Sequence, residues 1–235
     1  MPSEDTTTAS AKIEQHTFDI EVHEAKMPVA SLVLGHGAGA GKEHDFMQDI
    51  TRELVSHRIS VVLFNFPYMQ TIKATGKRRP PDKADKLMSH FTAVVASCCK
   101  DNKALHNLPV FIGGKSMGGR MASMVYESVS NVKGAIALGY PFHPPGKPEK
   151  TRTEHLSTAS KPMLIIQGER DTFGTKSEVE SYKKSYALSS HIECEYLEDG
   201  DHSFKPRKAS GKTQQEHIVQ AAALTASFID SVLRN

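Results

Sequence analysis

Short runs of apolar, largely β-branched residues recur along the chain, and each run ends in turn residues. Runs of this length and composition are typical of buried strands in a parallel sheet. They occupy residues 29–35, 59–66, 110–114, 134–140 and 161–168. Residues 192–198 alternate between apolar and polar instead, which predicts a strand at the edge of the sheet. An antiparallel pair of strands is also expected within residues 12–23.

Between these runs, apolar residues recur at intervals of three or four, which predicts helices with one buried face. The repeating positions are Phe46, Ile50 and Leu54, then Leu87, Phe91 and Val95, and then Met121, Met124 and Val125. Two later helices are expected to begin with capping boxes, at Ser177 with Glu180 and at Thr213 with Glu216. Strands that alternate with helices in this way predict an α/β fold with a mainly parallel sheet.

Two long polar segments interrupt this alternation, at residues 67–83 and 141–155, and both are expected to be loops. Each leaves the carboxyl end of a predicted strand, which is the edge where open α/β sheets place their binding sites. Loops of this length usually carry function or are disordered. The two segments are therefore the first places to look for contacts with a substrate.

Composition narrows the class of protein. The chain has 235 residues and no internal change of composition, so residues 12–235 are predicted to form one domain after a polar, disordered tail at residues 1–11. A net charge of +2 gives no reason to expect nucleic acid or a membrane as a partner. The three cysteines fit neither a disulfide framework nor a zinc site. With no apolar leader or membrane-length run, a cytoplasmic location is expected. The oligomeric state is left open.

The stretch FIGGKSMGGR, residues 111–120, can be interpreted as two different catalytic motifs. A phosphate-binding loop requires glycine five positions before Gly114, and that position holds Pro109. The glycines after residue 34 resemble a dinucleotide fingerprint, but the next predicted strand ends in Asn65 and Phe66 without the acid that binds ribose. Both nucleotide-binding interpretations therefore lack residues that they require.

The second interpretation is a nucleophile turn, G-x-S-x-G, centred on Ser116. Such a turn lies where a strand breaks sharply into a helix, and it holds the serine in a strained conformation with its hydroxyl exposed. The flanking positions crowd together, and here they are Gly114 and Gly118. We therefore predict that Ser116 is a nucleophile. Lys115 is expected to pack or pair beside the turn, and Arg120 to form a structural ion pair.

A serine nucleophile needs a general base and an acid that orients the base. After a turn of this kind the order along the chain is serine, acid, histidine. Asp171 and His202 each follow a predicted strand, so both are expected at the sheet edge that carries Ser116. His202 would accept the serine proton, and Asp171 would hold the imidazole in the required tautomer. Glu169 remains an alternative acid.

An oxyanion hole is expected from two backbone N–H groups. One belongs to Met117, the residue after the nucleophile, at a helix N-terminus where N–H groups lack partners. The other is assigned to Ala38 in the glycine-rich segment at residues 35–41, where Gly37 and Gly39 let the backbone approach a substrate.

The candidate contacts with the substrate are Gly37, Gly39, Tyr68, Arg78 and Arg79. Arg78 and Arg79 would recognise a carboxylate or phosphate if their basic loop folds over the site, whereas such a loop is more often a solvated surface. His36 and His44 have no third ligand in register, so no metal site is predicted. No cofactor is expected either.

Together the motifs LGHGAG, NFPYM followed by GKRRPPD, and GGKSMGGR resemble the α/β-hydrolase superfamily over nearly the whole chain from about residue 12. They are most similar to a dienelactone-hydrolase-related branch that includes testis-expressed-protein and NSL-complex-subunit relatives. The resemblance implies a core of eight strands without a large cap domain. It also supports Ser116, Asp171 and His202 as a triad, but it implies no particular substrate.

These observations lead to two functional hypotheses. The first is a serine hydrolase that cleaves a small ester, thioester or lactone through an acyl-enzyme. The second is a catalytically silent protein of the same fold that acts as a binding or complex subunit. An intact set of serine, acid and histidine favours the first hypothesis, because a binding module has no need of all three.

Overall fold

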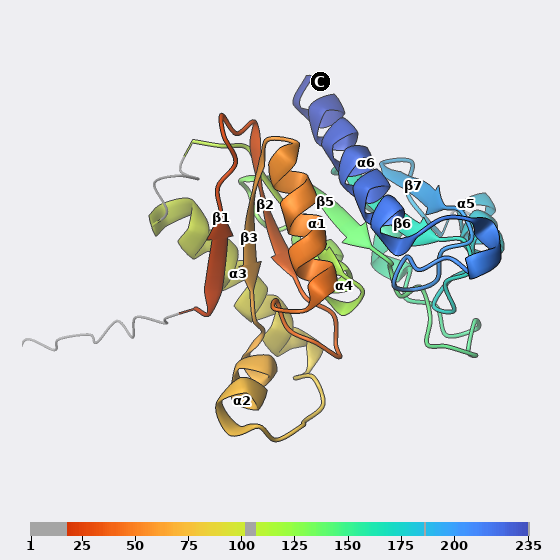
Figure 1. Ribbon diagram of the computed structural model, residues 1–235, viewed down its shortest axis with the longest axis horizontal. Coiled ribbons are helices and arrows are strands. Elements are labelled where there is room, and N and C mark those ends of the chain that lie inside the picture. The colour runs from red at the N-terminus through yellow and green to blue at the C-terminus, as the bar shows by residue number, and fades with distance from the viewer. Residues whose placement is uncertain (1–17, 102–106, 186, 235) are drawn as a thin grey trace, which may run out of the picture.

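A mostly parallel sheet of seven strands runs through the part of the chain that the computed structural model describes, residues 18–101, 107–185 and 187–234 (Figure 1). Its strands lie in the order β1-β3-β2-β4-β5-β6-β7, and only β1 is antiparallel to its neighbour. The strands are β1 (Ile20–His23), β2 (Ala30–Gly35), β3 (Ile59–Phe64), β4 (Val110–Lys115), β5 (Val132–Leu138), β6 (Met163–Gly168) and β7 (Ile192–Leu197).

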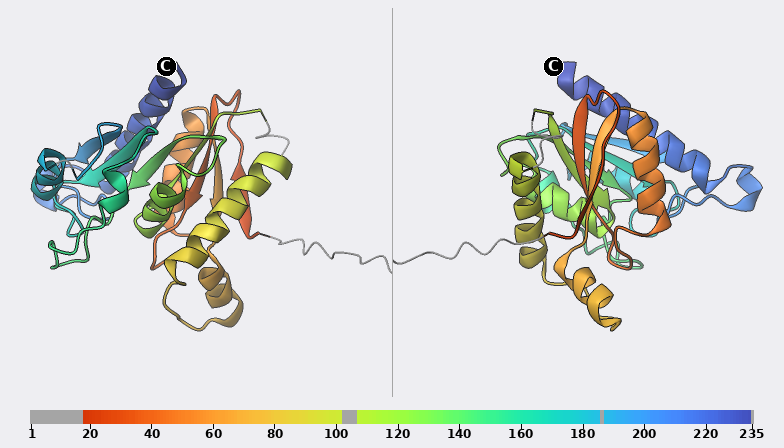
Figure 2. Two further views of the ribbon diagram at one scale, coloured as in Figure 1. Left: turned by 180° about the vertical axis from the view of Figure 1, so that it is seen from behind. Right: turned by 60° about the vertical axis from the view of Figure 1, so that its left-hand side comes forward.

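Helices cover both faces of this sheet (Figure 2). They are α1 (Asp45–Ser56), α2 (Pro67–Thr75), α3 (Ala84–Asp101), α4 (Met117–Val125), α5 (Lys176–Lys184) and α6 (Gln214–Arg234), with short 3₁₀ turns at Glu154–Leu156 and Lys208–Ser210. Helices α1 and α6 pack on one face, and α3, α4 and α5 pack on the other. None of the helices in the described residues combines the length and the apolar character needed to cross a membrane.

The sheet is buried because both of its faces carry apolar residues. Every residue of β2, β3, β4 and β6 is buried, as the continuous apolar runs predict. One core lies between the sheet and α1 with α6, and it includes Leu32, Leu34 and Phe228. The other lies under α3, α4 and α5 and includes Phe91 and Met121. The predicted α/β fold with a mainly parallel sheet and no large cap is thus confirmed.

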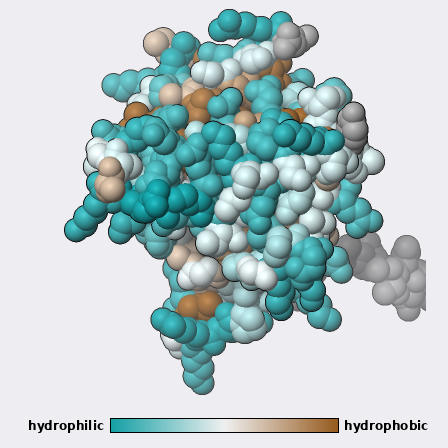
Figure 3. All heavy atoms as spheres, turned by 90° about the vertical axis from the view of Figure 1, so that its right-hand side faces the viewer, coloured by the Kyte–Doolittle hydropathy of each residue, from teal (hydrophilic) through white to brown (hydrophobic). Residues whose placement is uncertain are grey.

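Strand β7 lies at the edge of the sheet, as its alternating pattern predicts. Its two terminal residues are buried, and exposed residues lie between them. The face of the molecule at this end carries mainly hydrophilic residues with a few scattered apolar ones (Figure 3). A polar surface of this kind protects an edge strand from pairing with another chain.

Residues 67–83 differ from the predicted loop, because Pro67–Thr75 forms helix α2 beyond the carboxyl end of β3 (Figure 1). The helix starts with proline at its first position, where the missing N–H costs nothing, and it ends at Gly76 in the left-handed conformation with φ of 67°. Burial of Tyr68 and Met69 anchors it. The prediction overlooked these signals because the segment is short and mostly polar.

Three further expectations concern the helix capping boxes, the number of strands and the N-terminal tail. The capping box of α5 is formed by Thr175 and Glu178, two residues before the predicted pair, whereas the predicted box at Thr213 and Glu216 is present. The described residues contain seven strands rather than eight; of the antiparallel pair expected within residues 12–23, β1 is present, and residues 12–17 lie outside the described residues. The predicted disordered tail, residues 1–11, lies outside the described residues.

Candidate active site

The sharp turn between β4 and α4 places Ser116 at the carboxyl edge of the sheet. Its backbone has φ of 52° and ψ of −111°, a conformation that residues with a side chain rarely adopt. Holding such a residue costs about 1 to 3 kcal/mol and requires strong support from its surroundings. The strained serine expected from the G-x-S-x-G pattern is therefore observed, and it sits at the N-terminus of α4.

Glycines on both sides of Ser116 make this turn possible. A Cβ atom added to Gly114 would lie 2.3 Å from the carbonyl oxygen of Gly35, and one added to Gly118 would lie 2.2 Å from the same oxygen. The end of β2 thus presses against both flanks of the turn. The crowding predicted for the two flanking positions includes a third glycine, Gly35, that the motif alone does not identify.

We expect Gly118→Ala to destabilise the fold by more than about 3 kcal/mol, because the methyl group would overlap backbone atoms that cannot move independently. The comparison variant is Gly39→Ala, since no atom lies within 4 Å of its added Cβ. Urea unfolding of the two variants measures the difference. If Gly118→Ala is as stable as Gly39→Ala, the close approach of β2 to the turn is wrong.

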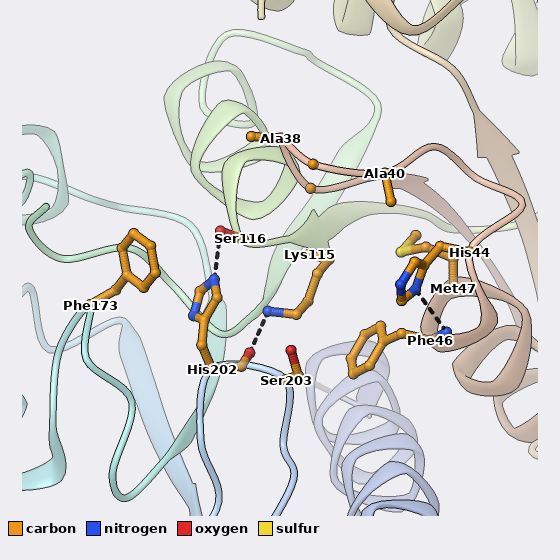
Figure 4. A pocket seen from close by; sticks show the side chains of 12 residues that line it. Ala38, Ala40, His44, Phe46, Met47, Lys115, Ser116, Phe173, His202 and Ser203 are labelled. Atoms are coloured by element: carbon orange, nitrogen blue, oxygen red, sulfur yellow. Dashed lines mark hydrogen bonds between the residues drawn. The ribbon is translucent and has the colours of Figure 1, made fainter. Parts of the chain in front are cut away.

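A chain of two hydrogen bonds joins Ser116 to Asp171 through His202. The Ser116 hydroxyl lies 2.8 Å from Nε2 of His202, and Nδ1 of the same ring lies 2.8 Å from Oδ2 of Asp171. With a proton on Nδ1, the imidazole donates to the carboxylate and accepts from the serine. The ring of Phe173 stacks on His202 with centroids 4.3 Å apart, which restrains its orientation (Figure 4).

Asp171 is completely buried, and its carboxylate is fully engaged by hydrogen-bond donors. Besides His202, the side chain of Gln167 donates at 2.9 Å and the backbone N–H of Phe173 donates at 2.8 Å. The alternative acid, Glu169, instead pairs with Lys176 and accepts from the N–H of Asp199. Of the two candidate acids, Asp171 is the one that contacts the histidine.

The glycine-rich segment after β2 is held from behind by His36 and Tyr68. The Tyr68 hydroxyl donates to the carbonyl oxygens of Gly37 and Ala38 at 3.2 and 2.9 Å. Nδ1 of His36 also lies 2.7 Å from the Gly37 oxygen, while Nε2 accepts from the N–H of Phe66 at 3.1 Å. Both side chains are fully buried. Neither His36 nor Tyr68 was identified from the sequence as a support for this segment.

These contacts fix the direction of the peptide between Gly37 and Ala38. In a trans peptide the carbonyl and the N–H of one unit point in opposite directions. Because the Gly37 carbonyl is held against Tyr68 and His36, the Ala38 N–H points away from them. Ala38 also lines the cavity that contains Ser116. The N–H that the sequence assigns to the oxyanion hole is therefore turned away from the supporting side chains.

Burial lowers the pKa of His36 to about 4, which keeps the ring neutral at physiological pH. In the unfolded chain a histidine has a pKa near its usual 6.5. Acidification from pH 6.5 to 4 protonates the unfolded state first, so stability falls over this window by up to about 3 kcal/mol. His155, with a pKa also near 4, contributes in the same direction.

The His36→Gln variant isolates the contribution of His36, because glutamine does not titrate. We expect its free energy of unfolding to decline less steeply between pH 6.5 and 4 than that of the wild type. Urea unfolding at several pH values across this window provides the measurement. Equal slopes for the two proteins would show that His36 is not held neutral in the folded state.

A cavity of about 460 Å³ opens around Ser116 and His202 (Figure 4). Its lining combines backbone of the glycine-rich segment with mostly apolar side chains. The lining residues are Gly37, Ala38, Gly39, Ala40, His44, Phe46, Met47, Lys115, Ser116, Phe173, His202 and Ser203. The cavity is therefore suited to a small, largely apolar group next to the serine hydroxyl.

Three of the predicted substrate contacts are not among the residues that line this cavity. Tyr68 is buried behind the glycine-rich segment with its hydroxyl already hydrogen-bonded, so it supports the site without facing it. Arg78 and Arg79 lie on the exposed loop after α2, where Arg79 approaches Asp82 at 3.5 Å. Their basic loop corresponds to the solvated surface that was the alternative expectation.

Two other expectations concern charged and metal-binding groups. Within the described residues no cluster of three histidine, cysteine or acidic side chains could hold a metal ion. Arg120 forms no salt bridge within the described part of the chain, and its buried Nε atom has no hydrogen-bond partner. The predicted structural ion pair of Arg120 is therefore wrong.

Comparison with known families identifies the family to which the chain belongs. The profile of a family described as an alpha/beta hydrolase domain matches residues 28–230. That range contains every residue of the proposed site.

Solved structures of similar fold include several hydrolases. A dienelactone hydrolase from Anabaena variabilis is 16% identical, with a TM-score of 0.67 and 90% of each chain covered. Est1E from Butyrivibrio proteoclasticus, solved with ferulic acid bound, is 13% identical with a TM-score of 0.67, covering 93% of this chain and 96% of that one. A serine hydrolase without a lid from Xanthomonas campestris is 16% identical with a TM-score of 0.64, covering 88% and 91%.

Proposed function

Because the chain belongs to the alpha/beta hydrolase family, we propose that it is a serine hydrolase that cleaves ester-type bonds through an acyl-enzyme. The observation that carries this proposal is the pair of 2.8 Å hydrogen bonds linking Ser116, His202 and Asp171. Each of the three residues comes from the carboxyl end of a different strand. Such a constellation has the geometry required of a nucleophile, its base and the group that orients the base.

In the first half of the reaction, Ser116 Oγ attacks the carbonyl carbon of the substrate while His202 Nε2 accepts the hydroxyl proton. Asp171 stabilises the imidazolium that forms, without taking the proton itself. The carbonyl oxygen becomes negatively charged and is bound by the N–H groups of Ala38 and Met117. His202 then gives its proton to the leaving alkoxide or thiolate, and the acyl group remains on Ser116.

In the second half of the reaction, water is the nucleophile and Ser116 is the leaving group. His202 removes a proton from water, the hydroxide attacks the acyl carbon, and Ser116 leaves with the proton returned from His202. The helix α4 begins at Met117, so its N-terminus adds a favourable field for the developing negative charge. These side chains and backbone groups supply the whole chemistry, so we propose that the enzyme needs no cofactor.

The cavity supports a small-molecule substrate whose acyl carbons pack against Phe46, Met47 and Phe173, which line it. Within the family, the motifs GHGAG and GKSMGGR favour the dienelactone-hydrolase-related branch with the testis-expressed-protein and NSL-complex-subunit relatives. We further propose that residues 12–235 fold as one domain and that the protein acts in the cytoplasm, where an odd number of cysteines stays reduced.

A panel of phenyl esters, thioesters and lactones with acyl chains from two to eight carbons tests the proposed activity. Turnover of at least one member by the purified full-length chain, lost in the Ser116→Ala variant, is the expected result. If the folded protein turns over none of them, the rival hypothesis of a catalytically silent binding subunit is favoured instead.

A further inference from the structure

The side chain of Lys115 lies in the wall of the catalytic cavity, where the triad itself does not use it. It is the last residue of β4 and directly precedes Ser116. Only 9% of the residue is exposed. Figure 4 shows its side chain extending toward the backbone oxygen of His202, in the space between His202 and Phe46. A cationic side chain therefore lines the same cavity as Ser116 and His202.

The Lys115 ammonium group has fewer partners than it can bind. It donates to the backbone oxygen of His202 at 2.5 Å. Nζ also lies 5.5 Å from the ring centroid of Phe46 and 5.7 Å from that of Phe204, and it packs closely on Gly139, where an added Cβ would lie 2.9 Å from it. An ammonium has three N–H donors and no acceptor. Within the described residues the ammonium has one hydrogen-bond acceptor, so two of its three N–H donors remain without a hydrogen-bond partner.

The nearest acids do not fill that place. Asp171 and Asp201 attract the ammonium through space, but neither forms a salt bridge with it among the described residues. The Asp171 carboxylate is occupied by His202 and Gln167, and Asp201 accepts from the backbone N–H groups that follow it. The other titratable side chains that line the cavity are His44 and His202, neither of which supplies a negative charge.

Burial makes this cation costly to keep. It lowers the pKa of Lys115 to about 8, and the attraction of Asp171 and Asp201 offsets only part of this effect. A negatively charged ligand next to Nζ would raise the pKa of Lys115 again, because a close opposite charge favours the protonated form. The cavity otherwise presents apolar and neutral groups, so the charge of Lys115 distinguishes one region of it.

Resting on the proposed esterase function, we propose that Lys115 binds an anionic group on the acyl part of the substrate. The acyl group stays bonded to Ser116 within the cavity, so its far end can reach the ammonium of the adjacent residue. Phe46 and Met47 would pack against the carbons between the scissile carbonyl and the anion. The substrate class is then half-esters of short dicarboxylic acids.

The test compares phenyl half-esters of succinic, glutaric and adipic acids with neutral phenyl esters of equal chain length. The readout is the ratio of kcat/KM for each charged ester to that for its neutral match. We expect wild-type enzyme to prefer at least one half-ester. Lys115→Met should lower that ratio about 10- to 100-fold, the effect of losing one hydrogen bond between charged groups.

The ratio separates recognition from positioning. If Lys115 only holds the His202 loop in place, the Lys115→Met variant loses activity equally on both esters and the ratio stays unchanged, which overturns the inference. The matched control removes two cations from the exposed basic loop, in Arg78→Ala/Arg79→Ala, and should keep the wild-type ratio. Loss of the ratio in this control also overturns the inference, because the recognising charge would then lie outside the cavity.

A second measurement needs no substitution and therefore does not depend on the folding of a variant. In wild-type enzyme the ratio should fall as pH rises through about 8, where Lys115 loses its proton. A ratio that is constant from pH 7 to 9.5 contradicts the inference. Turnover of the neutral esters that depends on Ser116 reports separately on the proposed function, so failure of the one is distinguishable from failure of the other.

Discussion

Replacing Ser116 with alanine is expected to lower kcat about 10⁶-fold, the order of loss found when a serine nucleophile is removed from a triad. The loss has a direct cause. Without Oγ no acyl-enzyme forms, although the oxyanion hole and the cavity can still bind the ester. KM should therefore change much less than kcat. Steady-state hydrolysis of the best ester found for the wild type, measured at high enzyme concentration, gives both parameters.

A second substitution at the same position separates chemistry from folding. Ser116→Gly removes the nucleophile as well, but glycine adopts φ of 52° without strain. We expect it to be inactive yet more stable than Ser116→Ala by about 1 kcal/mol, as measured by urea unfolding. Equal stability of the two variants would indicate that the turn carries no strain, and retained activity in either would show that Ser116 is not the nucleophile.

Replacing Asp171 with asparagine is expected to lower kcat about 10⁴-fold while the fold is retained. The amide would favour the wrong tautomer of His202, which then presents an N–H to Ser116 in place of an acceptor. It also cannot stabilise the imidazolium formed when the serine proton is transferred. A single-turnover assay with an activated ester measures the acylation step on which both effects act.

Glu169→Gln is the matched control, because Glu169 leaves the same strand end two residues earlier and carries the same charge. Its carboxylate pairs with Lys176 at 2.8 Å and has no contact with the triad. We expect kcat within about twofold of the wild type, since an exposed ion pair contributes little. If Glu169→Gln is impaired and Asp171→Asn is not, the acid of the triad has been assigned to the wrong residue.

Much of the fold could be predicted from local patterns along the chain. The continuous apolar runs identify buried parallel strands, and the sheet brings their carboxyl ends to one edge. Ser116 and Asp171 follow two such strands, and His202 follows the alternating edge strand, which is why their convergence could be predicted without a structure. The strained backbone of Ser116 was likewise predicted, because a G-x-S-x-G turn between a strand and a helix demands it, and the structure shows the strain as a φ of 52°.

The supports of the site could not be predicted, because they depend on contacts between distant residues. Tyr68 lies thirty positions from the Ala38 carbonyl that it binds, and the same separation joins His36 to the N–H of Phe66. Nothing in the sequence near either residue indicates its partner. Helix α2 places Tyr68 against the glycine-rich segment. Assigning residues 67–83 to a loop concealed this role.

The position of Lys115 shows a similar limit. From the sequence, its place beside Ser116 suggests packing or pairing near the turn, whereas the basic run at Arg78 and Arg79 attracts attention as an anion-binding loop. Burial and the surrounding aromatic rings determine instead which cation lines the catalytic cavity. Both arginines are exposed and Arg79 pairs with Asp82, whereas the buried lysine lines the cavity with a single acceptor. Charge in a sequence does not reveal which cation is desolvated.

Covalent labelling by a fluorophosphonate probe tests most directly whether Ser116 is an activated nucleophile. The probe phosphonylates a serine only when a base removes the hydroxyl proton. We predict one adduct per chain, located at Ser116 by peptide mass spectrometry and absent in Ser116→Ala. Labelling should be slowed strongly in His202→Ala. Folded wild-type protein that remains unlabelled, or an adduct on a different serine, would contradict the assignment of Ser116, His202 and Asp171 as a working triad.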